Sequence, residues 1–280
     1  MKNKGIQYIL LSSLFFSLMS VSVKSIPDVP QVQKIFFRNF IGLMVISSTL
    51  YRTRTFPKAN NKKLILLRCT FGLLGVTANY YALSKLLLAD SIIIHKLSPF
   101  FVMILSYLFL GEKFTKGKSI SLIFALTGAL FVIKPSFNIS IFPFAIAILG
   151  AFFAGCAYTI IRKLSESDSP KVIVFYFCLF SSIITFPLMF RNGFDAPSLS
   201  ELFFLVAIGI SALIAQLFMT TAYRYAQASE LSIYTNVNIL FSMFFGLVLW
   251  SEIPDIYSLF GGFLVVLAGY INYKMRLKSS

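Results

Sequence analysis

Charged side chains are scarce in this sequence: Asp, Glu, Lys and Arg make up 12% of the 280 residues, whereas 58% are hydrophobic. A soluble domain carries about a quarter charged residues, which cover its surface in water. The apolar residues fall in blocks of roughly 17–22, about the length that a helix needs to cross the hydrocarbon of a bilayer. These blocks are apolar all round and lack the alternation of transmembrane strands. The sequence therefore predicts an all-α membrane protein.

Residue types that bind metals or carry out catalysis are also scarce. The sequence has one histidine, His95, and three cysteines, Cys69, Cys156 and Cys178, which all lie inside apolar blocks. This pattern argues against a His-ligated metal centre and favours cysteines that pack as small apolar side chains. No G-x-x-x-x-G-K-[ST] loop is present, so ATP is not the direct energy source. We expect no enzyme activity, no metal and no cofactor.

The basic residues predict how the chain crosses the membrane. The net charge of +15 comes from breaks between apolar blocks, which indicates topology and anionic lipid headgroups rather than nucleic acid. With a cytoplasmic N-terminus, 17 Lys and Arg lie on the cytoplasmic side and 5 on the other. We therefore expect both termini in the cytoplasm, a retained first span and a location in the bacterial inner membrane. The ten expected spans are residues 6–23, 33–51, 64–83, 90–110, 118–134, 141–161, 171–190, 201–221, 230–250 and 256–273.

An internal repeat becomes visible when the chain is shifted by 140 residues. Asp90 then matches Glu230, and Glu112 matches Glu252, each pair flanking about twenty apolar residues. The pattern predicts two five-helix units, residues 1–140 and 141–280. Because five is odd, the second unit must insert in the opposite orientation, as in many transporters. Two such copies can exchange conformations and open one central site to each side of the membrane in turn.

Five segments carry a resemblance to a known group: "FFRNF", "LLRCTFG", "LSPFFVMILSYLFLGEKF", "AFFAGCAYTIIRKL" and "NVNILFSMFFGLVLWSE". The chain resembles the drug/metabolite transporter superfamily and, within it, the EamA-type ten-helix transporters. The resemblance implies a central cavity lined mainly by spans 1, 3, 4, 6, 8 and 9, with spans 5 and 10 at the periphery, at the contact of an expected homodimer. Members of this family usually have a proline in span 9 as well as in span 4. Here span 4 has Pro99, but the matching residue of span 9 is Ile239.

Ionisable residues inside spans are the first candidates for a site, because burying them in a membrane is costly. Arg38 together with Lys24 and Lys96 is expected to line the outer half of the pathway and to favour a substrate with a carboxylate or phosphate. The alternative is that each pairs with a helix C-terminus or a lipid phosphate. His95 is a site candidate or an interhelical packing residue. Arg68, near the start of span 3, is expected to anchor the membrane interface.

Neutral polar residues extend the list of candidates. Asn236 and Asn238 offer both donors and acceptors to a polar ligand, although hydrogen bonding between helices is an equal alternative. Tyrosines near the ends of spans are more often interfacial residues than ligands. The substrate-binding candidates are Lys24, Arg38, Tyr81, His95, Lys96, Tyr158, Gln216, Tyr234, Asn236 and Asn238.

Four acidic residues are candidates for coupling or gating. Asp90 and Glu230 open spans 4 and 9, where the free N–H groups of a helix N-terminus stabilise a carboxylate. Glu112 and Glu252 close the same spans, and we expect them to cap spans 5 and 10 or to gate the two faces.

The leading hypothesis is a secondary transporter for a small polar metabolite. An amino-acid-like or nucleoside-like substrate is expected, and "ALSKLLLADSIIIHKLSPFFV" looks like a segment of S-adenosylmethionine carriers. Export of amino acids or toxic metabolites is the main alternative. A membrane-embedded lipid-modifying enzyme needs a nucleophile–base or metal constellation, and a scaffold or sensor needs larger loops or tails. The expected partners are a small-molecule substrate and membrane lipids.

Overall fold

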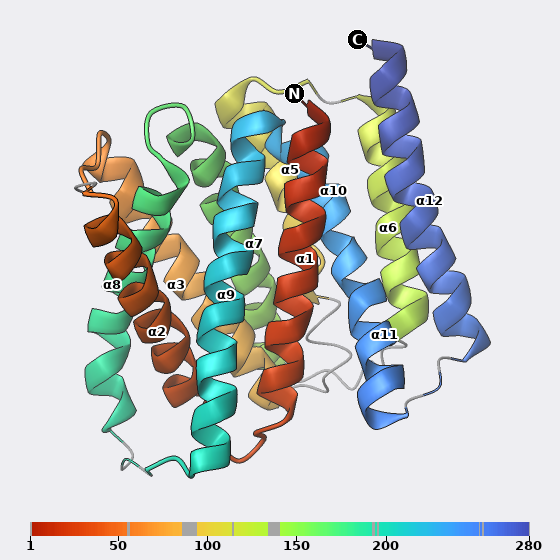
Figure 1. Cartoon of the computed structure of the whole chain (residues 1–280). Helices are drawn as coiled ribbons and strands as arrows, with labels where there is room; N and C mark the ends of the chain where they lie inside the picture. Colours follow the sequence, from red (N-terminus) through yellow and green to blue (C-terminus); the bar gives the residue numbers. More distant parts are fainter. Residues whose placement is uncertain are drawn as a thin grey trace.

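The computed structural model describes residues 2–54, 57–85, 94–113, 115–133, 141–191, 194, 196–251, 253 and 255–279. Helices account for the regular structure throughout this part of the chain, and no strand occurs in it (Figure 1). The prediction of an all-α protein is confirmed. The helices are α1 (Lys2–Lys24), α2 (Gln31–Arg52), α3 (Lys62–Lys85), α5 (Ser98–Leu110), α6 (Lys116–Ile133), α7 (Ile141–Leu164), α8 (Pro170–Met189), α9 (Leu199–Tyr225), α10 (Ala228–Tyr234), the 3₁₀ helix η1 (Thr235–Val237), α11 (Asn238–Trp250) and α12 (Ile256–Ser279).

The outside of the bundle is apolar. Six helical segments among the described residues are long and apolar enough to cross a membrane, and two shorter apolar helices accompany them. Large hydrophobic side chains such as Phe109, Phe142 and Phe203 are well exposed, which a protein in water avoids on this scale. These features define a multi-pass membrane protein.

Helices from the two halves of the chain pack against each other. The most extensive contacts join α1 to α9, α3 to α7, α6 to α12, and α2 to α8. Small residues bring α3 and α7 close together, since a Cβ added to Gly75 would lie 3.1 Å from the backbone nitrogen of Ala154. Figure 1 shows α2, α3 and α8 on one side of α1 and α9, and α6 with α12 on the other side. The place of α6 and α12 agrees with the periphery implied for spans 5 and 10.

The ninth expected span is interrupted. It consists of α10, one turn of 3₁₀ helix (η1) and α11, without a proline at the break. A 3₁₀ turn inside a helix often marks a functional hinge. The helix α5 starts and ends 140 residues before α11, and both helices end in a left-handed residue, Gly111 (φ 65°) and Ser251 (φ 55°). The two segments therefore share a backbone course although only one has a proline at its start.

Candidate functional site

A buried arginine lies at the centre of the contacts between α3, α8 and α9. Arg68 is 2% exposed, and its guanidinium lies 4.1 Å from the centre of the Phe177 ring on α8. Its Nη2 donates a hydrogen bond to Oε1 of Gln216 on α9, at 3.2 Å. The side chain extends over Gly72, one turn further into α3, where an added Cβ would lie 2.1 Å from Nη1. The expectation that Arg68 anchors the interface is wrong, because Gly72 leaves room for the side chain to run inward.

Most of the hydrogen-bonding capacity of Arg68 is unused. Its Nε and Nη1 are buried and have no hydrogen-bond partner in the described part of the chain. The titratable groups that act on it are Cys69, Tyr158, Cys178 and Arg38, and no carboxylate is among them in the described part of the chain. Buried arginines are usually paired with an acid or fully hydrogen-bonded, because an unpaired buried charge is costly.

A second buried arginine, Arg38 on α2, lies close enough to act on Arg68 electrostatically. It is 6% exposed and hydrogen-bonds the side chain of Tyr80 on α3. Tyr158 on α7 is a neighbour of both arginines. We call Arg38, Arg68, Tyr80, Tyr158 and Gln216 the arginine cluster.

Aromatic rings continue the arginine cluster toward the end of the bundle where both chain termini lie. Tyr158 stacks on Tyr223 of α9 with ring centres 6.3 Å apart. Tyr223 is fully buried, and its hydroxyl has no hydrogen-bond partner within the described ranges. The interior thus combines two positive charges, polar hydroxyls and aromatic faces, an arrangement suited to holding an anionic organic molecule. No group of three metal-ligating side chains occurs among the described residues.

Lys24, Arg38 and Lys96 were expected to line one part of the pathway together. In the structure, Arg38 lies near Arg68 instead. Lys24 is the last residue of α1 and is exposed. His95 and Lys96 are half-buried just before α5, and neither makes a hydrogen bond or ion pair with another described residue. Tyr81 packs edge-on against Phe142 of α7, with ring centres 6.4 Å apart.

The polar residues of the interrupted ninth span differ in their roles. Asn238 donates hydrogen bonds to the Ser13 carbonyl at 3.1 Å and to Ser17 Oγ at 2.7 Å, which ties α11 to α1. Tyr234 donates to the carbonyl of Gly269 on α12, at 3.3 Å. Asn236 is fully buried at the break, and its Oδ1 has no partner. Asn238 and Tyr234 thus join helices, whereas Asn236 has a buried acceptor with no partner among the described residues.

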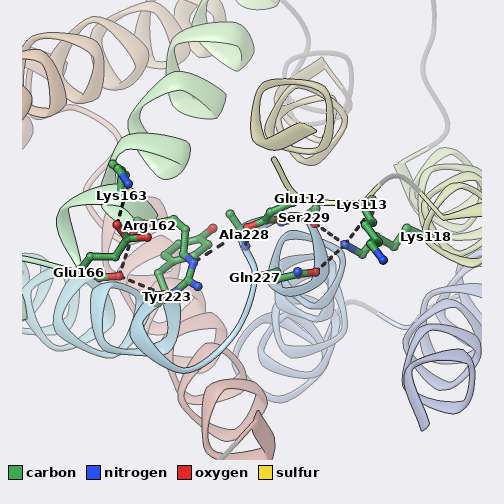
Figure 2. A network of polar contacts seen from close by, with 11 residues as sticks. Glu112, Lys113, Lys118, Arg162, Lys163, Glu166, Tyr223, Gln227, Ala228 and Ser229 are labelled. Atoms are coloured by element: carbon green, nitrogen blue, oxygen red, sulfur yellow. Dashed lines mark hydrogen bonds and ion pairs between the residues drawn. The ribbon is translucent and has the colours of Figure 1, made fainter. Parts of the chain in front are cut away.

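A polar network closes the end of the bundle at which both chain termini lie, which we call the terminal face (Figures 1 and 2). The carboxylate of Glu112 accepts hydrogen bonds from the backbone N–H groups of Ala228 and Ser229, at 2.9 and 3.0 Å, and from the Ser229 hydroxyl. Glu112 therefore caps α10, at the start of the ninth span. From the sequence, it was expected to cap the following helix, α6, or to act in gating, whereas these hydrogen bonds of its carboxylate go to α10.

Basic side chains surround this carboxylate. Lys118 Nζ donates to Ser229 Oγ at 2.7 Å and to Gln227 Oε1 at 2.8 Å. Arg162 Nε lies 4.0 Å from the Glu112 carboxylate, and its Nη1 donates to the Tyr223 carbonyl at 2.6 Å. We call Glu112, Lys118, Arg162, Gln227 and Ser229 the seal (Figure 2). Charge-assisted bonds of this kind are among the strongest between side chains, so the seal holds α5, α6, α7 and α10 together.

Of the remaining acidic candidates, Glu230 lies among the described residues. Glu230 lies in the first turn of α10 and is buried, as expected for a carboxylate at a helix N-terminus. Its backbone carbonyl accepts a hydrogen bond from Asn272 of α12 at 3.3 Å. Asp90 and Glu252 lie outside the described residues.

Two hollows open at the surface beside α1. The larger, about 530 Å³, lies between α1 and Phe241 of α11, and the smaller, about 330 Å³, is lined by Tyr234, Tyr270 and Tyr273. Neither borders the arginine cluster. Their lining is mostly apolar and aromatic, so they offer little that would recognise a polar metabolite.

Apolar helices around a charged interior are the arrangement of a multi-pass membrane protein, and comparisons with known proteins identify its family. The chain matches the EamA-like transporter family twice, at residues 3–134 and 142–273, and belongs to it. The pseudopaline exporter CntI of Pseudomonas aeruginosa strain PAO1 is 32% identical over 266 residues, which cover 94% of both chains. Human solute carrier family 35 member G1 is 29% identical and covers 97% of this chain and 79% of its own.

Two further comparisons, one of sequence and one of structure, agree with this result. An uncharacterized transporter of Helicobacter pylori strain J99 is 27% identical over 95% of this chain and 93% of its own length. A crystal structure with 15% sequence identity superposes over the whole of both chains with a TM-score of 0.89, which shows a common fold. The membership in the drug/metabolite transporter superfamily expected from the sequence is confirmed.

Sequence reasoning did not predict that Arg68 lies near Arg38. The residues lie on different helices, and the position of Arg68 within its span suggested the interface. One signal was present, since Gly72 follows Arg68 by one helical turn and leaves the adjoining face open for a long side chain.

Proposed function

We propose that the protein is a secondary transporter that moves a small polar metabolite across the inner membrane by alternating access. The observation that carries this proposal is the correspondence between α5 and α11. Both helices begin and end 140 residues apart, follow a non-α-helical turn and end in a left-handed residue. Interrupted helices at matching places in two halves commonly form transporter sites and hinges.

The proposed topology has ten spans in two inverted units, residues 1–140 and 141–280, with both termini in the cytoplasm. The two family matches, one in each unit, support the division. The packing supports a symmetric pair of units: the first span of each unit contacts the third span of the other, α1 with α9 and α7 with α3. A two-fold relation between the units produces this arrangement.

In this topology the terminal face is the cytoplasmic face, and the seal closes it. Opening to the cytoplasm then requires Glu112 to release the first turn of α10. By the 140-residue correspondence, we assign the equivalent role at the other face to Glu252. The carboxylates would thus gate the two faces in turn.

The direction we propose is export. The similarity to a protein named as a pseudopaline exporter, at 32% identity over nearly the whole chain, supports it. An amino-acid-like or nucleoside-like substrate remains our proposal, with S-adenosylmethionine one member of that class and amino acids or toxic metabolites another. The transporter would carry out no covalent chemistry and would work as a monomer or homodimer.

Counterflow into proteoliposomes tests the proposal without knowledge of a coupling ion. Vesicles with purified protein are loaded with one unlabelled compound and diluted into its labelled form, using L-glutamate, L-alanine, adenosine and S-adenosylmethionine in turn. We expect transient accumulation of at least one compound, absent from protein-free vesicles. If no compound accumulates while the lipids of the same vesicles change in mass, the protein is a lipid-modifying enzyme and not a transporter.

A further inference from the structure

Two buried arginines carry positive charge that no carboxylate among the described residues balances. Arg38 and Arg68 are 6% and 2% exposed and act on each other electrostatically. Neither forms an ion pair with a carboxylate among the described residues. In a low-dielectric interior, two uncompensated guanidinium groups repel each other and attract any anion that can reach them. The missing negative charge is therefore expected to arrive with a ligand.

Arg68 is held in position without being satisfied. Phe177 supports one face of the guanidinium, Gln216 accepts from Nη2, and Gly72 leaves space along the side chain. Nε and Nη1 remain as buried donors. A guanidinium orients its N–H groups in a plane that matches the two oxygens of a carboxylate, so a held guanidinium with unused donors is suited to bind one.

Charge counting then sets the class of ligand. One carboxylate neutralises Arg68 and leaves Arg38 unbalanced, whereas two carboxylates neutralise both. A ligand with an additional positive charge, such as a sulfonium group, gains less from this site. Tyr80 and Tyr158 next to the two arginines supply further hydroxyls for the oxygens of an anion.

We infer that Arg38 and Arg68 form a dianion site that binds two carboxylates of one substrate molecule. This inference rests on the proposed transport function and names the substrate class: small organic dicarboxylates. Each arginine holds one carboxylate, and Gln216 orients Arg68.

Binding to the purified full-length protein in nanodiscs tests the inference directly. The probes are the series succinate, glutarate, adipate and pimelate, which varies the distance between the carboxylates, together with L-glutamate. Each has a matched monoamide, such as succinamate or L-glutamine. We expect at least one diacid to bind about 10-fold or more tightly than its monoamide, since one charged contact is lost in the amide. Equal affinity of every acid and its monoamide overturns the inference.

Substitutions assign the preference to the two arginines. We expect Arg38→Gln and Arg68→Gln each to reduce the ratio of diacid to monoamide affinity to about 1, and Arg68→Lys to restore part of it. Lys34→Gln is the matched control, because Lys34 is a buried cation one turn earlier on α2 that lies outside the arginine cluster. A diacid preference that survives both glutamine variants overturns the inference.

A glycine variant tests the position of the charge without removing it. In Gly72→Ala the new Cβ would lie 2.1 Å from Arg68 Nη1, so the guanidinium must move. We expect weaker diacid binding, as in Arg68→Lys. Gly269→Ala is the control, because its Cβ makes only ordinary contacts at 3.5 Å. Unchanged diacid affinity in Gly72→Ala contradicts the assigned place of Arg68.

The two proposals fail in different ways. Counterflow of a neutral or cationic compound that is indifferent to Arg38 and Arg68 retains the transporter and rejects the dianion site. Arginine-dependent diacid binding without counterflow of any compound retains the dianion site and rejects transport.

Discussion

Removing the charge of Arg68 should make the empty protein more stable, although it abolishes the proposed site. The variant is Arg68→Met together with Gln216→Met, which replaces a buried donor and its acceptor by apolar chains of similar length. Two buried donors, Nε and Nη1, lack partners, and each such donor costs about 1–3 kcal/mol. The variant therefore gains about 2–6 kcal/mol from this source.

Losses offset part of this gain. The contact of Arg68 with the Phe177 ring, at 4.1 Å, contributes about 1–2 kcal/mol in a desolvated setting. The hydrogen bond to Gln216 contributes about 1 kcal/mol. A net gain of about 2 kcal/mol remains, which corresponds to a rise in Tm of roughly 4 °C for a chain of this size.

Thermal unfolding of detergent-solubilised protein, followed by circular dichroism without ligand, measures this change. Arg162→Met is the matched control, because Arg162 donates to the Tyr223 carbonyl at 2.6 Å and lies 4.0 Å from Glu112. We expect the control to lower Tm. A double variant that is less stable than the wild type by about 1 kcal/mol or more, the contribution of one hydrogen bond, would refute this reasoning. It would show that Arg68 is fully hydrogen-bonded in the empty protein and stabilises the fold.

Three further predictions concern the seal and the helix geometry. Glu112→Gln should speed amide hydrogen exchange in the first turn of α10 by about 10-fold or more, as measured by mass spectrometry. The control Glu166→Gln, on the same face, should leave this exchange unchanged. Equal exchange rates in the two variants would reject the seal. Gly111→Ala should lower Tm through about 1 kcal/mol of backbone strain, whereas Ser251→Gly should not, and the opposite order would contradict the two left-handed helix ends. Gly128→Ala should lower the free energy of unfolding by about 1–3 kcal/mol, because its Cβ would lie 2.6 Å from a backbone carbonyl oxygen of α12. An unchanged Tm in thermal unfolding would argue against the close contact of α6 with α12.

Most of the helices could be predicted from the sequence because the membrane imposes a simple rule. A spanning segment must satisfy its backbone internally and expose apolar side chains, so its length and its basic flanks can be read directly. The break at Thr235–Val237 follows no such rule. It has no proline, and its clue is the correspondence with α5, which only the repeat provides.

The site was harder to predict than the fold, for reasons visible at Arg68 and Asn238. Depth in a span was judged from the position of Cα, but an arginine side chain can run about a turn along its helix in either direction. Only the packing of Gly72 and Phe177 decides that it runs inward. Asn238 looked like a ligand residue, yet it bonds Ser17 and joins two helices. Which polar residues are already satisfied by neighbours depends on tertiary contacts that one sequence does not display.

The arginine cluster and the seal differ in how their charges are satisfied, and they share two helices. On α7, Tyr158 of the cluster lies one turn from Arg162 of the seal. On α9, Gln216 precedes Tyr223 by seven residues, two turns that place both on the same face, and the Tyr223 carbonyl accepts from Arg162. A ligand can shift the balance between two states only through a difference in its affinity for them. If an anion draws Arg68 away from Gln216, the change occurs on the helix that also supports the seal. Under the proposed function, the neutralised arginines and the released Glu112 would belong to one movement of α7 and α9 against α10, which would couple occupancy of the interior to opening of the terminal face.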